Sequence, residues 1–338
     1  MEATFPMFID PYTQRPLQKD HEGNLYTALD GTQPVYRPVR GSYNFVREDN
    51  LEREHYETEY QEQSIRSLDV EDIRGPWYDA CVPWYNTLIQ SMGDLSGKKI
   101  LLVGAGRSCK EFYFPMCGAD VIFTDLSLQG VLASSAEHRA AQAVQNNSSG
   151  MIEDHRPGRE RGSIQFHAAD ATHLPFANES FDIVYGAAFV HHLDDWVPFL
   201  LETNRVLKPG GICRFYDQAD SWLWSLLKRT VLRPLQMYSY WRQPRSEGDI
   251  RANSRGGFNQ PNMLTLMRAA GFRKLYFQRQ SFILVIGLRH VGKVLKWNKR
   301  AMQAARPIFH CCRLLDVLTA WCHRISDNRL ALIWGFEK

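Results

Sequence analysis

Two glycines and a carboxylate are the residues of this chain with the clearest chemistry. Gly104 and Gly106 follow the apolar run 100–103, and Asp125 follows a second apolar run, 121–123, about twenty residues later. Glycine lets a ligand approach the backbone, and a carboxylate can accept protons from two neighbouring hydroxyl groups. This spacing is typical of a β-turn-α-β unit that binds a nucleoside. Short G-x-G sequences also occur as plain turns, so the pattern alone leaves both readings open.

Two adjacent histidines form a second candidate group. His191 and His192 follow the strand-like run 181–185, just past its C-terminal end, where open α/β sheets bind their ligands. Histidine exchanges protons near neutral pH, so either residue could act as a general base. A structural role in the loop is the alternative for both. The neighbouring acids Asp194 and Asp195 do not indicate a metal site, because adjacent side chains rarely converge on one ion.

The elements that must position these residues alternate along the chain. The predicted strands are 100–103, 121–123, 164–168, 181–185, 212–216, 274–280 and 330–336, and the predicted helices include 77–92, 128–145, 196–207 and 263–270. Alternation of strands and helices predicts an α/β fold with a Rossmann-like sheet of seven mostly parallel strands and helices on both faces. In such a sheet the glycine turn, Asp125 and the histidine pair would share one edge.

Composition narrows the class of protein. A chain of 338 residues with 44% hydrophobic residues can bury a sizeable core, and a net charge of +3 is too small to predict nucleic-acid binding. The seven cysteines contain no C-x-x-C pair, so neither a zinc site nor a disulfide framework is indicated. Residues 1–12 lack the basic start and apolar core of a signal peptide, and no uncharged run is long enough to span a membrane. These features predict a cytoplasmic protein with reduced thiols.

Four segments of the chain carry a family resemblance. In order they are LLVGAGRS, VIFTDLS, DATHLPFANESFDIVYGAAFVHHLDD and ETNRVLKPGG, and together they span Lys98 to about Asp217. They resemble the class I S-adenosylmethionine-dependent methyltransferases of the type that includes the ubiquinone and menaquinone biosynthesis enzymes (methyltransferase type 11). The resemblance implies S-adenosyl-L-methionine as cofactor and in-line methyl transfer to a small-molecule or lipid-like acceptor.

The resemblance also implies a cofactor site. Its residues would be Gly104, Ala105, Gly106, Arg107, Ser108, Asp125, Leu126, Asp170, Ala171 and Ala187. Asp125 would hold the ribose hydroxyls, Leu126 would flank the adenine, and Asp170 with Ala171 would meet the adenine edge. Ala187 would border the methionine or substrate end. For Asp170, a role as a turn or capping residue is the alternative.

Two departures from the family pattern keep other functions open. Leu102 stands where the family commonly has an acidic residue that contacts the cofactor's amino group, and Ser108 replaces a third glycine. The methionine end would then depend on Arg107, Ser108 or a residue from an N-terminal helix. An NAD(P)-dependent dehydrogenase would also fit the glycine turn and Asp125, although it should carry the third glycine. A non-catalytic protein that retains the methyltransferase fold is the other alternative.

The chain divides into three predicted parts. Residues 1–50 resemble a degenerate Trm112-like module without its zinc cysteines, an irregular arm being the alternative. Residues 51–95 form a charged connector and N-terminal helices. Residues 96–338 form the methyltransferase domain, with an aromatic-rich substrate cover at 219–262 and a basic helical insertion at 289–326.

The insertion suggests a possible membrane contact. Residues 289–324 contain eight lysines and arginines but the single acid Asp316, and apolar residues recur at helical spacing. A basic amphipathic segment can lie on an anionic membrane surface, which would place the protein at the membrane periphery. It can equally pack its apolar face on the domain and leave its charges in water.

Overall fold

The fold is known from a computed structural model of the chain. It describes residues 7–27, 33–50, 53, 56–57, 87–106, 113–145, 162–187, 189–193, 195–218, 226, 229–230, 264–265, 267–268, 272, 274–280, 283–295, 297–319 and 331–338. Nearly all of the predicted substrate cover, most of the predicted helix 77–92 and half of the predicted helix 263–270 lie outside these residues, as do Arg107 and Ser108.

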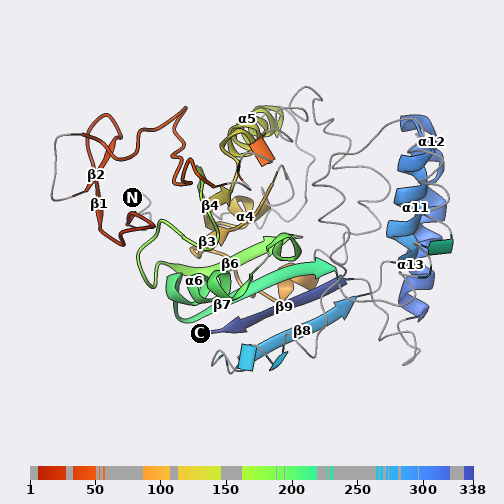
Figure 1. The fold of residues 1–338 in the computed structure, drawn as a ribbon. Coiled ribbons are helices and arrows are strands. Elements are labelled where there is room, and N and C mark those ends of the chain that lie inside the picture. The colour runs from red at the N-terminus through yellow and green to blue at the C-terminus, as the bar shows by residue number, and fades with distance from the viewer. Residues whose placement is uncertain are drawn as a thin grey trace.

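A seven-stranded sheet forms the centre of the molecule (Figure 1). Its strands are β3 (Lys99–Leu102), β4 (Asp120–Asp125), β5 (Ile164–Ala168), β6 (Phe181–Ala187), β7 (Leu207–Gln218), β8 (Lys274–Gln280) and β9 (Ala331–Glu337). The spatial order is β5-β4-β3-β6-β7-β9-β8, in which β9 runs antiparallel to both of its neighbours and the pairs from β5 to β7 are parallel. The predicted Rossmann-like, mostly parallel sheet is confirmed.

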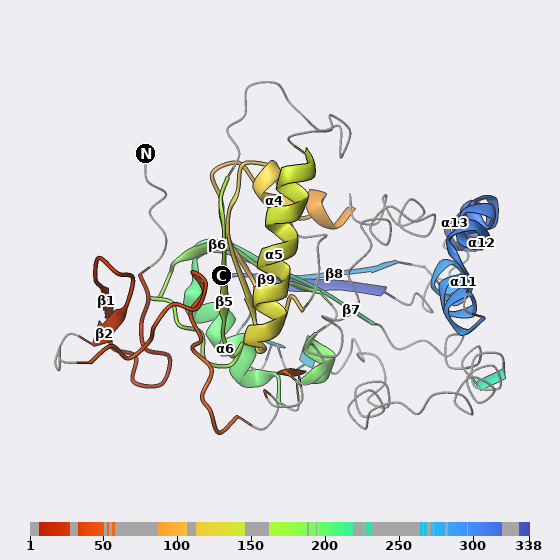
Figure 2. The same ribbon diagram turned by 90° about the horizontal axis from the view of Figure 1, so that it is seen from above.

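Helices cover both faces of the sheet. The named helices are α4 (Tyr113–Met116), α5 (Leu128–Gln145), the 3-10 helix η2 (Val190–His192), α6 (Val197–Val206), α11 (Ile283–Val294), α12 (Lys299–Ala304) and α13 (Arg306–Thr319). Alternate residues of β3 point to opposite faces, as in any strand. Leu101 belongs to the core that contains Phe199 of α6, whereas Ile100 belongs to the core that contains Val131 of α5. Figure 2 shows these two helices on opposite sides of the sheet.

Strand β7 is longer than predicted. The sequence indicated only residues 212–216, because Pro209, Gly210 and Gly211 are typical of a helix stop. Gly210 N–H donates to the carbonyl of Lys338, and Lys338 N–H donates to the carbonyl of Gly211, both at 3.0 Å. These two bonds keep the turn-like residues within the sheet. No local sequence pattern predicts the bonds, because their partner is distant in the chain.

The N-terminal segment docks on the edge of the sheet. It contains a short antiparallel pair, β1 (Leu17–Lys19) and β2 (Leu25–Thr27) (Figure 1). Phe45 N–H donates to the carbonyl of Ala168 at 2.9 Å, and Ala168 N–H donates to the carbonyl of Tyr43 at 2.8 Å. The segment therefore extends the backbone pairing of β5. Its resemblance to a Trm112-like module stays a prediction.

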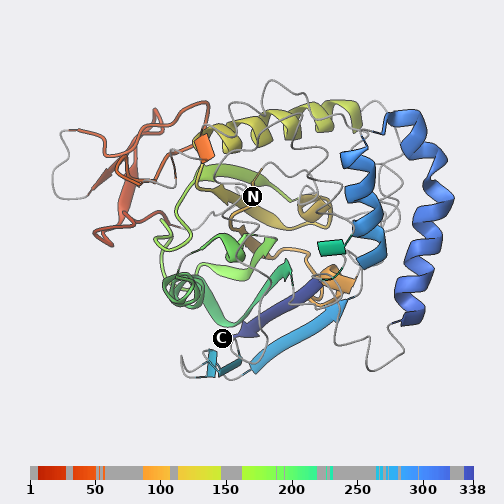
Figure 3. The same ribbon diagram turned by 45° about the vertical axis from the view of Figure 1, so that its right-hand side comes forward.

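Helices α11 and α13 pack against each other around Phe309 and lie at the opposite end of the molecule from the N-terminal segment (Figure 3). Helix α11 begins before the predicted insertion boundary at residue 289. The reason is a cap supplied by another helix: the carboxylate of Asp316 in α13 accepts from Leu284 N–H and Val285 N–H, both at 3.3 Å. Within the described ranges, no helix has both the length and the apolar character needed to cross a bilayer.

Candidate functional site

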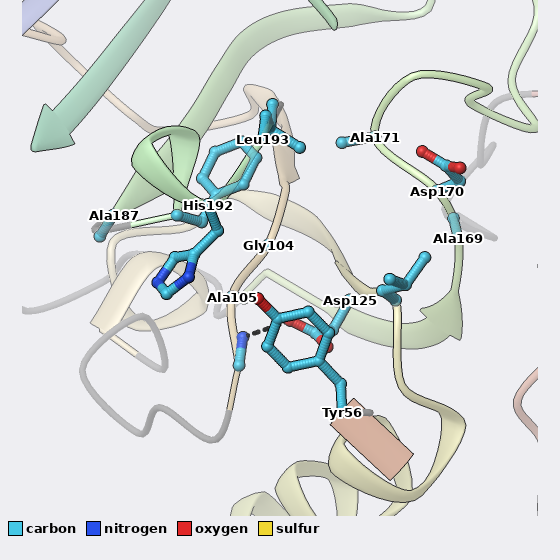
Figure 4. A pocket seen from close by; sticks show the side chains of 13 residues that line it. Tyr56, Gly104, Ala105, Asp125, Ala169, Asp170, Ala171, Ala187, His192 and Leu193 are labelled. Carbon is cyan, nitrogen blue, oxygen red and sulfur yellow. Dashed lines mark hydrogen bonds between the residues drawn. The ribbon is translucent and has the colours of Figure 1, made fainter. Parts of the chain in front are cut away.

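A pocket of about 210 Å³ opens at the carboxyl ends of β3, β4, β5 and β6 (Figure 4). Nine of the twelve predicted site residues line it, namely Gly104, Ala105, Gly106, Asp125, Leu126, Asp170, Ala171, Ala187 and His192. Arg107, Ser108 and the side chain of His191 lie outside the described part of the chain. The lining also includes four residues that sequence reasoning did not select: Tyr56, Ala169, Phe189 and Leu193.

Asp125 ends β4 and is held in place by backbone donors. Its Oδ2 accepts from Gly106 N–H at 2.7 Å, and its Oδ1 accepts from Ser127 N–H at 3.0 Å. Burial, with a smaller contribution from the negative charge of Glu57, raises the pKa of this carboxyl to about 6, although the hydrogen bonds from Ser127 and Gly106 oppose the rise. The carboxylate keeps free lone pairs, because each oxygen has two, and it lines the pocket.

Gly104 of the glycine turn lines the pocket, and the ring of Phe189 packs against it. Gly104 has a φ of +55°, and a Cβ placed on it would lie 2.3 Å from Cγ of Phe189. A Cβ on Gly186 would lie 2.4 Å from Cε1 of the same ring. Phe189 is therefore lodged between two glycines, and both positions require the absence of a side chain.

Asp170 takes part in a turn as well as lining the pocket. Its Oδ1 accepts from the backbone N–H and the hydroxyl of Thr172 at 2.8 and 2.7 Å, and its Oδ2 accepts from Nδ2 of Asn50 at 3.2 Å. The alternative weighed for this residue, a turn role, is thus present in the structure. It is compatible with a second role toward a ligand, since carboxylate oxygens accept more than one bond.

His192 and Tyr56 stand at the rim. Their ring centroids are 6.2 Å apart at 81°, and both side chains line the pocket (Figure 4). Tyr56 comes from the charged connector, in which the sequence indicated no particular site residue. No local pattern distinguishes it from the other tyrosines, because its place depends on how the connector docks on α5.

Leu102 is fully buried in the core beside α5. Its side chain therefore makes no contribution to the pocket, and the acidic contact common in the family has no counterpart at this position. Among the described residues, no group of three or more histidine, cysteine, aspartate or glutamate side chains could hold a metal ion.

The fold and the site together have the geometry of an α/β domain that could bind a nucleoside. A carboxylate ends the second strand of the β3-β4 crossover, and the first strand ends at the glycine turn. In agreement, residues 101–215 match the family model described as "Methyltransferase domain". This part of the chain is therefore similar to methyltransferase domains.

Several proteins are similar to this part of the chain. Demethylmenaquinone methyltransferase of Renibacterium salmoninarum is 30% identical over 128 residues, which cover 38% of this chain and 44% of that protein. Phthiotriol/phenolphthiotriol dimycocerosates methyltransferase of Mycobacterium leprae is 31% identical over 130 residues, covering 38% and 40%. The chain thus spans less than half the length of these two relatives. A solved structure of Haemonchus contortus phosphoethanolamine N-methyltransferase 2 with S-adenosyl-L-methionine has 15% identity and a TM-score of 0.46, covering 76% of this chain and 52% of that chain.

Proposed function

We propose that this protein transfers the methyl group of S-adenosyl-L-methionine to a small, lipid-like acceptor. The observation that carries the proposal is the Asp125 carboxylate, held by Gly106 N–H in a pocket that the glycine turn also lines. A carboxylate with free lone pairs suits the two ribose hydroxyls, and the glycine turn suits a ligand that approaches the main chain. Leu126, Asp170 and Ala171 would flank the adenine.

The acceptor class is supported by the names of the relatives. One is named for a quinone substrate and another for a long-chain lipid substrate. Both kinds of acceptor are largely apolar. A lipid-like acceptor is therefore the form of the proposal that agrees with the relatives.

The chemistry asks little of the protein beyond alignment. The cofactor supplies an electrophilic sulfonium methyl group, so the acceptor atom bonds to that carbon as the carbon–sulfur bond breaks. An acceptor that is an oxygen or carbon acid must also lose a proton. We infer that His192, at the pocket rim, or the adjacent His191 takes that proton, because histidine titrates near neutral pH.

Calorimetric titration with S-adenosylmethionine, S-adenosylhomocysteine and NAD tests the proposal. A methyltransferase should bind both sulfur ligands and ignore NAD, whereas a dehydrogenase should show the reverse. His192→Ala should leave cofactor binding nearly unchanged while slowing methyl transfer. Failure of the wild-type protein to bind S-adenosylhomocysteine at saturating concentration would remove the proposed function.

Cofactor affinity should depend on pH through Asp125. The pKa of this carboxyl is raised to about 6, so the group is ionised above pH 7 and becomes protonated as the pH falls through 6. Only the ionised form accepts protons from both ribose hydroxyls, and we therefore expect the dissociation constant of S-adenosylhomocysteine to rise as pH falls from 7.5 to 5.5. Calorimetry over this range measures it. The pH step should persist in His192→Ala and vanish in Asp125→Asn.

We further propose that α13 contacts an anionic membrane surface, from which a lipid-like acceptor could be taken. Ile308, Leu315 and Leu318 recur at helical spacing and lie on one face, with Leu314 beside them. Their exposed fractions are 52%, 50%, 57% and 60%. The opposite, buried face of the helix packs against α11. Of the two alternatives that the sequence left open, this exposure favours the membrane.

The charge of the residues around α13 favours an anionic lipid surface as the partner. The segment from Ile283 to Thr319 contains seven lysines and arginines and the one acid Asp316. Asp316 is buried, with its carboxylate oxygens bonded to Leu284 N–H and Val285 N–H. The described basic residues of this segment that are exposed are Arg300 and Arg306. An apolar face with basic flanks is the pattern that binds at an anionic lipid interface.

Liposome flotation tests the membrane contact. Wild-type protein should float with vesicles of phosphatidylcholine and phosphatidylserine, and Leu314→Glu/Leu318→Glu should reduce the recovered fraction by about tenfold, because two anchors are lost. The matched control is Leu201→Glu, which alters an equally exposed leucine (53%) in α6. Equal recovery of all three proteins, or equal recovery on neutral vesicles, would contradict the contact.

A further inference from the structure

Asn50, which directly precedes the connector, makes the first link between the connector and the pocket. Its Nδ2 donates to Oδ2 of Asp170 at 3.2 Å, and its Oδ1 accepts from Arg53 N–H at 3.1 Å. The second bond is that of a residue capping a helical turn, and Arg53, Tyr56 and Glu57 are all helical. One amide group thus joins the start of this turn to a residue of the pocket.

The second tie is a cap provided by Glu57 to α5. Its Oε1 accepts from Leu128 N–H at 2.8 Å, and its Oε2 accepts from Gln129 N–H at 3.0 Å and from the hydroxyl of Ser127 at 2.9 Å. The first N–H groups of a helix have no partner within the helix, and its positive end favours a carboxylate. This carboxylate comes from 71 residues before Leu128 in the chain. Three bonds therefore fix the connector to the helix that follows Asp125.

Tyr56 lies between these two ties and forms a wall of the pocket. It faces His192, with ring centroids 6.2 Å apart, and it lines the same pocket as Ala105 and Asp125 (Figure 4). Tyr56 therefore adds an aromatic surface to a pocket that is also lined by backbone and a carboxylate. An aromatic ring excludes water from a bound nucleoside and can stack on or face a cationic group.

We propose that Asn50, Tyr56 and Glu57, here called the clasp, complete the cofactor site. Tyr56 is the residue that covers the bound nucleoside, and Asn50 and Glu57 are positioning residues that hold it across the pocket. The inference rests on the proposed function, because it names further residues of the same site. The consequence is that cofactor affinity depends on the N-terminal part of the chain as well as on the methyltransferase domain.

Titration of the full-length protein with S-adenosylhomocysteine tests the clasp. Tyr56→Ala and Glu57→Gln should each weaken binding by about tenfold, the size expected for a lost aromatic wall or a lost charged cap. Tyr56→Phe should stay within about twofold of wild type, because the ring surface remains. Glu48→Gln is the matched control, since Glu48 is an exposed acid that lies shortly before the connector in the chain.

A double-mutant cycle separates positioning from general support of the fold. If Glu57 acts through Tyr56, Glu57→Gln should cause no further loss of affinity in the Tyr56→Ala background. Additive losses would overturn the positioning role, even if each variant alone binds more weakly. Wild-type affinity in Tyr56→Ala and Glu57→Gln would overturn the clasp while leaving the proposed function intact. Absence of binding by the wild-type protein would instead remove the proposed function itself.

Discussion

Replacing Asp125 with alanine should weaken the binding of S-adenosylhomocysteine by roughly 10²–10³-fold. A hydrogen bond to a charged group contributes about 1.5–3 kcal/mol, two ribose hydroxyls would donate to this carboxylate, and each 1.4 kcal/mol is tenfold in affinity. The substitution also leaves Gly106 N–H and Ser127 N–H without their acceptor, so the turn that supports the ligand should loosen. Calorimetry on purified variants measures the effect.

The controls for Asp125 come from the same strand. Asp120 lies at the other end of β4, where it accepts from Ser163 N–H at 3.1 Å, far from the pocket lining. Asp120→Asn should therefore change the dissociation constant by less than about twofold, a change of under 0.5 kcal/mol. Asp125→Asn keeps the shape but loses the charge and should fall between wild type and alanine. A folded Asp125→Ala variant with wild-type affinity would remove the ribose assignment.

The second large effect is expected at the glycine turn. Gly104→Ala should lower the free energy of unfolding by about 2–5 kcal/mol, of which roughly 1–2 comes from a left-handed backbone and 1–3 from overpacking. The added Cβ would lie 2.3 Å from the ring of Phe189, and that ring cannot retreat easily, because it packs edge-on against Phe199 at 5.1 Å and faces Gly186 on its other side. Chemical denaturation measures the loss.

Gly210→Ala isolates the backbone part of this effect. Gly210 also has a positive φ, +75°, but a Cβ there would meet nothing within 4 Å. Its substitution should cost only about 1–2 kcal/mol. Equal destabilisation by the two substitutions would show that contact with Phe189 is not important. Gly104→Ala should in addition weaken cofactor binding, because the lining of the pocket moves with the ring.

Local sequence was sufficient for much of the sheet and for the centre of the site. Helix α5 and strands β5 and β8 have the predicted bounds, because apolar periodicity and turn residues are local signals. The convergence of the glycine turn, Asp125 and His192 followed from one rule, that the carboxyl ends of parallel strands share an edge. These features depend on residues that are close in the chain.

Tertiary structure alone decided the features that join distant segments. Three features each depend on a partner far away in sequence. They are the capping of α5 by Glu57, the position of Tyr56 in the pocket, and the start of α11 at a turn that Asp316 caps. Burial likewise decided which apolar face of α13 packs and which stays exposed, because periodicity marks a face without showing what covers it. The sequence by itself determined the sheet and the carboxylate at its edge. Docking of the connector determined that Tyr56 lines the pocket, and the packing of α11 on α13 determined which face of α13 is exposed.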